Sequence, residues 1–152
     1  MKITIEGADK EFTAKLVVLA AQHDAELTVT TVDTAWTAER AEQYLASLPT
    51  NALRFAKLVV DANGDKPAEE LREAFHGELR GPTIALSRAV PRGVRRGWWP
   101  SGTEAPITPR YDPDHPSWQK AIAYTMTSEN VTAFRAAFAQ LGMAAQMISP
   151  TK

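Results

Sequence analysis

LRGPTIALSRAVPRGVRRGWWP, residues 79–100, is the segment of the chain that says most about fold and function. Pro82 suits the first turn of a helix, where its missing N–H leaves no hydrogen bond unmade. Three apolar residues recur at every fourth position and share one helix face: Leu86, Val90 and Val94. Small residues run alongside at the same spacing: Ala89, Gly93 and Gly97. The segment therefore predicts a helix over residues 82–96 that approaches a neighbouring helix closely.

The opposite face of this predicted helix is basic. Between Leu79 and Thr103 the chain has five arginines and no acidic residue. The outward residues are Thr83, Ser87, Arg88, Arg92 and Arg95. Guanidinium groups match both phosphate and the guanine edge. We therefore expect Ser87 and Arg88 to contact DNA bases, and expect phosphate contacts from the later arginines, Arg92, Arg95 and Arg96.

Pro91 interrupts this pattern. Inside a helix it removes one hydrogen bond and costs about 3 kcal/mol. The sequence therefore predicts that the helix kinks or ends at Pro91, which would move the later arginines onto a second short helical turn.

Three helices are predicted before this segment. Thr37 caps the first, whose inward residues are Ala41, Tyr44, Leu45 and Leu48. Thr50 or Asn51 caps the second, which Asn63-Gly64 terminates. Asp65 and Pro67 begin the third, in which Leu71, Ala74 and Phe75 form an apolar stripe, and His76-Gly77 marks the turn that follows.

A β-hairpin with a long tip and a last helix are predicted downstream. Trp98 and Trp99 open a first strand, a Pro-rich excursion follows, and Ile122, Tyr124 and Met126 alternate with small residues as in a strand. Arg110, near the middle of this region, is positioned to touch the DNA backbone or minor groove. Ser128 caps the final helix, with Val131, Phe134, Phe138 and Leu141 turned inward.

The first 34 residues predict a separate β-α-β unit. Ile3 and Ile5 alternate with polar residues over 2–6, residues 9–22 have helical spacing after a possible cap at Asp9, and 27–31 return to a period of two. Two strands and one helix cannot close a core alone. We therefore divide the chain into this unit (1–34), a main domain (35–145) and a flexible tail (146–152).

The order helix-helix-helix-hairpin-helix over residues 37–141 resembles the winged helix-turn-helix proteins. The resemblance implies an α+β fold in which the helix over 82–96 is the recognition helix and the hairpin is the wing. It implies sequence-preferring binding of double-stranded DNA by a homodimer that regulates transcription. The Ala- and Arg-rich composition and the GWWP motif also resemble those of small proteins of high-GC actinobacteria and their phages. This resemblance implies no activity.

Composition excludes several other classes. The chain has 152 residues, 44% of them hydrophobic and 23% charged, which is typical of folded domains. It has no cysteine, which excludes disulfides and thiolate catalysis. No catalytic set or phosphate loop is visible, so we expect no enzyme and no cofactor. The DPDHP stretch at 112–116 reads as a turn rather than a metal site. We expect a cytoplasmic protein with no membrane segment.

Alternatives remain open at this point. The arginines can form a solvated face, or be neutralised by six acidic residues between Asp61 and Glu78. The same scaffold can serve as a protein-interaction adaptor through the acidic helix (65–75) and the Pro-rich loop (100–116). A third alternative is a small-molecule sensor with a ligand pocket between the N-terminal unit and the winged helix.

Overall fold

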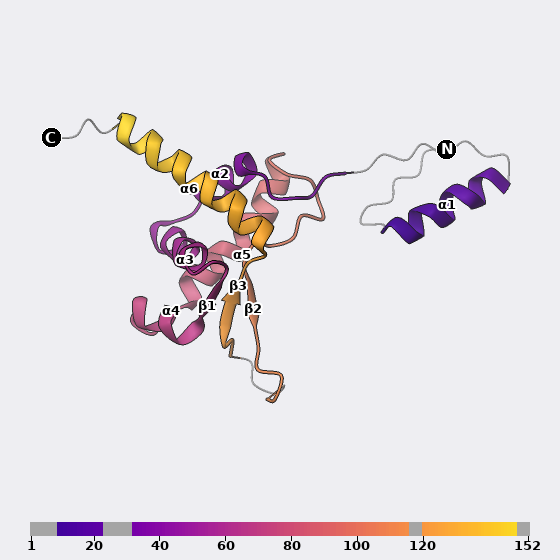
Figure 1. Ribbon diagram of the computed structural model, residues 1–152. Helices are drawn as coiled ribbons and strands as arrows, with labels where there is room; N and C mark the ends of the chain where they lie inside the picture. The colour runs from indigo at the N-terminus through magenta and orange to yellow at the C-terminus, as the bar shows by residue number, and fades with distance from the viewer. Residues whose placement is uncertain (1–8, 23–31, 116–119, 149–152) are drawn as a thin grey trace.

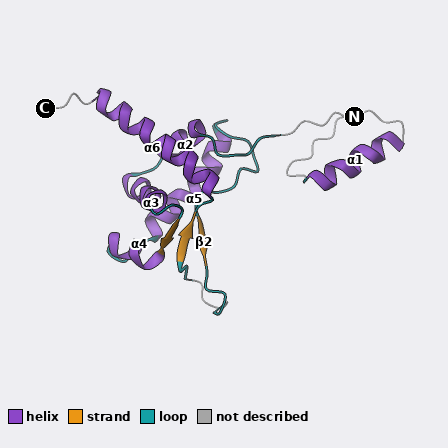
Figure 2. Ribbon diagram, in the orientation of Figure 1, coloured by secondary structure: helices purple, strands orange, loops and turns teal. Residues whose placement is uncertain are grey.

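The computed structural model describes residues 9–22, 32–115 and 120–148. The helices are α1 (Lys10–Gln22), α2 (Ala38–Ala46), α3 (Thr50–Asp61), α4 (Ala68–Ala74), α5 (Arg80–Arg95) and α6 (Ser128–Ile148). The strands are β1 (Asp65–Pro67), β2 (Thr108–Arg110) and β3 (Ala123–Thr125). Helices and a small antiparallel sheet make this an α+β fold, as the sequence predicts (Figures 1 and 2).

Local capping signals set several of the helix ends. The hydroxyl of Thr37 accepts a 3.1 Å hydrogen bond from the Arg40 N–H, which confirms the predicted cap of α2. Asn63 and Gly64 have φ of 63° and 88° and terminate α3. Two predicted caps are displaced by one residue. Pro49 precedes α3 without a side-chain cap, and Thr127, rather than Ser128, caps α6.

The third predicted helix begins later than the sequence indicates. Asp65–Pro67 is strand β1, which pairs antiparallel with β3, and α4 starts only at Ala68. Proline restricts the preceding residue to extended backbone, so Lys66 favours a strand. The Ala68 N–H then donates to the Ile122 carbonyl at 2.9 Å.

The sheet has the order β1-β3-β2, so β3 is its central strand. Pro67 lies in β1 and Pro109 in β2, the two edge strands, where a missing N–H is tolerated. β2 and β3 form a hairpin, but β2 lies within the Pro-rich stretch predicted to form its tip. The described residues between the two strands project away from α6 (Figure 1). The expected strand at Trp98 and Trp99 is wrong, because both residues lie in the turn after α5.

The core is closed by aromatic side chains between α2, α6 and the segment after α5. Trp36 has ring centroids of Tyr44, Trp99 and Phe134 within 4.9–5.5 Å. α6 packs along α2, and α5 packs against α3. Trp99 is buried and Trp98 is half-buried against the core.

Of the elements predicted for the β-α-β unit (1–34), the structure describes only the helix. α1 forms where expected, and the Asp9 carboxylate caps it by accepting from the Phe12 N–H at 2.8 Å. The strands expected over 2–6 and 27–31 lie outside the described residues. At the other end, α6 continues to Ile148, so the first residues of the expected tail are helical. Within the described part of the chain, no helix combines the length and hydropathy needed to cross a bilayer.

Candidate nucleic-acid interface

α5 is one continuous helix from Arg80 to Arg95, so of the two outcomes predicted at Pro91, a kink or an end, the end is wrong. Pro91 is exposed, whereas Leu86, Ala89 and Gly93 on the opposite face are buried on both sides of it. Burial of this face stabilises the helix on both sides of Pro91 despite the missing Pro91 N–H.

Three hydrogen-bonding side chains hold α5 to the segments beside it: Tyr44 and Trp99 from outside the helix, and Arg92 from α5 itself. The Tyr44 hydroxyl donates to the Leu86 carbonyl at 3.0 Å, and the Trp99 indole N–H donates to the Val90 carbonyl at 2.9 Å. The Arg92 guanidinium donates to the Ser47 carbonyl at 3.1 Å and to its hydroxyl at 3.0 Å. The orientation of α5 is therefore fixed by α2 and by the turn after α5.

The outer side of α5 carries what we call the basic ridge: Arg80, Ser87, Arg88 and Arg95. All four residues are exposed. At about 100° per residue, they fall within an arc of roughly 100° on the helix surface. Within the described residues, none of the three ridge guanidinium groups makes an ion pair or a hydrogen bond. Three positive charges are thus presented together to solvent.

Two residues predicted on this face are placed elsewhere. Thr83 is half-buried, and its hydroxyl donates to the Leu79 carbonyl at 2.8 Å. Arg92 is half-buried against Ser47, as described above. Both groups are engaged by main-chain carbonyls, so the prediction that they face outward is wrong.

Arg96 and Arg110 also have partners. The Arg96 guanidinium lies 5.2 Å from the ring centroid of Trp98. The Arg110 guanidinium lies 3.4 Å from the Asp65 carboxylate, across exposed side chains. Arg110 belongs to β2 and not to the hairpin tip. An exposed pair of this kind is weak, and both arginines are exposed to solvent.

The acidic residues before α5 do not neutralise the ridge in the described structure. Asp61 pairs with Lys57, Asp65 with Arg110, and Glu70 with Lys66. The other three are exposed and reach no ridge arginine: Glu69, Glu73 and Glu78. Internal neutralisation, one of the alternatives left open by the sequence, is therefore absent among the described residues.

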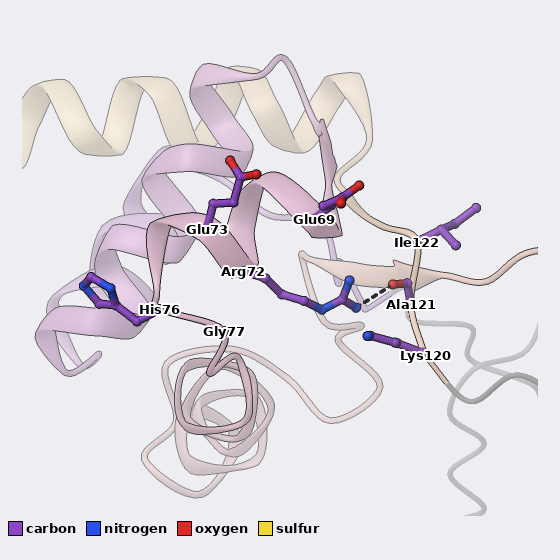
Figure 3. Close-up of a pocket in the computed structure, with 8 residues that line it drawn as sticks. All are labelled: Glu69, Arg72, Glu73, His76, Gly77, Lys120, Ala121 and Ile122. Atoms are coloured by element: carbon purple, nitrogen blue, oxygen red, sulfur yellow. Dashed lines mark hydrogen bonds between the residues drawn. The ribbon is translucent and has the colours of Figure 1, made fainter.

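Two features of this region are not predicted from the sequence. Arg80 joins the ridge because α5 begins two residues before the predicted start at Pro82. An open depression of about 710 Å³ separates α4 from the base of β3 (Figure 3). Arg72 spans it, donating to the Ala121 carbonyl at 3.0 Å. The charged side chains around it have mixed sign: Glu69, Glu73, Arg72 and Lys120.

The connection between β2 and β3 contains the DPDHP stretch. The His115 Nδ1 lies 2.9 Å from the Asp112 carboxylate, which also accepts from the Asp114 N–H at 2.9 Å. The bond to His115 is the main reason that the pKa of Asp112 is below its ordinary value, with the Asp114 N–H second. These local bonds form the expected Asx-type turn.

α1 differs from the other helices in its exposure. None of its residues is buried, and four large apolar side chains are 45–56% exposed: Phe12, Val17, Val18 and Leu19. Glu11 and Lys15 form a 3.3 Å ion pair along one side. A helix with this much apolar surface requires a partner to be stable in water.

Comparison of the chain with protein-family models, with curated proteins and with solved structures finds no match.

Proposed function

We propose that this chain binds double-stranded DNA through α5 and regulates transcription. The observation that carries the proposal is the basic ridge, in which Arg80, Arg88 and Arg95 stand exposed on one helix without acidic partners among the described residues. A chain of net charge −1 has no global attraction to DNA, so any affinity has to arise from such a local surface. An α-helix of this kind has the dimensions to enter the major groove.

The order of elements around α5 supports a winged helix-turn-helix arrangement. α4, a turn over residues 75–79 and α5 would form the helix-turn-helix, with β2 and β3 as the wing. In such motifs the second helix enters the groove while the first crosses the backbone. The hairpin, with Arg110 and the exposed Lys120, would then reach the adjacent backbone or minor groove.

A second copy of the chain is the partner that we propose for α1. Glu11 and Lys15 on one face of α1 are self-complementary, because an antiparallel pair of α1 helices would place each carboxylate opposite the other copy's ammonium group. The exposed Val18 and Leu19 lie on the same helix face as Glu11 and Lys15 and would be covered in the same contact. A symmetric dimer of this kind would recognise palindromic half-sites.

Light scattering tests the dimer directly. We expect the mass of two chains for the wild type and of one chain for a Val18→Lys/Leu19→Lys variant with unchanged helix content. A wild-type monomer at micromolar concentration would overturn the α1 contact.

Fluorescence anisotropy across a salt series tests DNA binding. The probe is a labelled 30-base-pair duplex of mixed sequence, and the variant is Arg88→Ala/Arg95→Ala. We expect binding at low salt that weakens as salt rises, and a loss of about two units from the slope of log K against log salt in the variant. Arg135→Ala is the control, since it removes a positive charge from α6, where Arg135 donates to Asn63.

Two results would overturn the proposal: no duplex affinity at low salt, or affinity that the double variant leaves unchanged. In that case the protein-interaction adaptor becomes the better hypothesis, with exposed Glu69 and Glu73 of α4 as its first surface to test.

A further inference from the structure

We infer that the N-terminal half of α5 reads a short sequence in which two guanines flank a thymine, with Arg80 and Arg88 on the guanines and Ile84 on the thymine methyl. This inference rests on the proposed DNA binding and adds the class of base sequence that the ridge would select. It depends on the position of one apolar residue among the arginines.

Ile84 lies at the middle of the exposed arc of α5. With 3.6 residues per turn, it is about 40° from Arg80 and about 40° from Arg88, and Ser87 falls within the same arc. Ile84 is only half-buried and does not belong to the core or to the residues packed against it. A helix face that only maintains solubility would not need an isoleucine between two arginines.

The spacing of these side chains fits successive base pairs. Residues 80, 84 and 88 advance about 6 Å per step along the helix axis, so the two arginines are about 12 Å apart. Base pairs are spaced about 3.4 Å along the duplex, and 12 Å corresponds to three or four of them. A side chain midway between the arginines therefore faces a base pair between the two that they reach.

The chemistry of each side chain selects the base. An unpaired guanidinium group donates two hydrogen bonds to guanine O6 and N7, and Arg80 and Arg88 have no other partner among the described residues. An aliphatic side chain cannot hydrogen-bond to a base edge and instead favours the C5 methyl of thymine. The Ser87 hydroxyl can donate or accept, so it adds little discrimination.

The remaining ridge residue lies too far along the helix to share this task. Arg95 lies about 22 Å beyond Arg80, near the C-terminal end of α5 and past the exposed Pro91, whereas a recognition helix contacts base edges with its N-terminal residues. Arg95 is therefore assigned to a phosphate and serves as the control for sequence-independent contact.

Selection from random duplexes followed by base substitution tests the inference. We expect the selected sites to hold two guanines three or four base pairs apart with a thymine between them. Replacing that thymine by deoxyuridine removes only the methyl group and should weaken wild-type binding about fourfold. The Ile84→Ala variant should bind both duplexes equally, whereas Arg95→Ala should keep the fourfold preference while binding both more weakly.

Replacing one guanine by 7-deazaguanine tests the arginines in the same way. Loss of N7 should weaken wild-type binding roughly fivefold or more, and Arg88→Ala should abolish this sensitivity at one of the two guanines. Circular dichroism of each variant confirms the fold. Duplex binding that is indifferent to both base changes, or selected sites without the guanine pair, would overturn this inference while leaving DNA binding intact. Absence of all duplex binding would instead overturn the proposed function.

Discussion

The phenolic hydroxyl of Tyr44 donates a 3.0 Å hydrogen bond to the main-chain carbonyl of Leu86, joining α2 to the inner side of α5. Tyr44 is 1% exposed, and Leu86 lies one position before the ridge residue Ser87. The orientation of the outer face of α5 thus depends on a bond made on its inner face.

Tyr44→Phe should lower the free energy of unfolding by about 1 kcal/mol. The substitution removes the hydroxyl but keeps the ring, which packs against Trp36 and Phe134 at centroid distances of 5.2 and 5.8 Å. Urea denaturation measures the difference. An unchanged midpoint would mean that this hydrogen bond contributes no net stability.

The same pair of proteins should differ in alkaline stability. Burial raises the pKa of Tyr44 above its ordinary value of 10.0, an effect larger than the opposing attraction of the Arg92 charge. Above pH 10 the unfolded chain loses the phenolic proton while the folded chain keeps it, so the free energy of unfolding falls as pH rises. We expect the wild type to lose up to about 1.4 kcal/mol per pH unit more than Tyr44→Phe above pH 10. Parallel pH profiles would contradict this.

Gly93→Ala should destabilise the protein, although alanine favours helices. A Cβ at position 93 would overlap the ring of Trp99, which folds back over α5. We expect a loss of about 2 kcal/mol in urea denaturation. Gly142→Ala in α6 is the matched control, because open space surrounds that position, and it should gain about 0.5–1 kcal/mol. If both variants were stabilised, the close contact with Trp99 would be in doubt.

The parts of the fold that the sequence predicts are those with local signals. Thr37 caps α2 through a residue three positions away, and Asn63-Gly64 ends α3 through backbone conformation alone. The helix, turn and hairpin order around α5 follows from such signals. It is sufficient to predict an α+β class and the exposed positions of Ser87, Arg88 and Arg95.

The parts that the sequence does not predict depend on contacts between distant residues. β1 has three residues and is a strand only through its pairing with β3, in which Lys66 lies opposite Tyr124. Arg92 faces inward because Ser47, 45 residues earlier, supplies its two acceptors. Neither the β1–β3 pairing nor the contact between Arg92 and Ser47 produces a periodic sequence pattern near Lys66 or Arg92. The sequence alone therefore does not predict either contact.

Arg92→Ala and Arg95→Ala should separate structural from binding contributions. Arg92→Ala leaves the Ser47 carbonyl without its charged donor and should cost about 1.5 kcal/mol of stability. Arg95 has no partner among the described residues, so Arg95→Ala should change stability by less than about 0.5 kcal/mol. It should nevertheless reduce the salt dependence of duplex binding by about one unit. Equal losses of stability would contradict the different placements of these two arginines.

Glu78→Gln should strengthen duplex binding. Glu78 is exposed in the turn before α5, two residues ahead of Arg80, so its carboxylate would face the phosphates that the ridge attracts. Repulsion at about 8 Å in water amounts to roughly 0.5 kcal/mol, and its removal should raise affinity about twofold at low salt and less at high salt. Glu39→Gln, in the first turn of α2, is the matched control, because it makes the same charge change near another helix N-terminus. Anisotropy titrations of the mixed-sequence duplex measure both variants. An equal gain for both would mean that only net charge matters, whereas a gain confined to Glu78→Gln would locate the duplex at the start of α5.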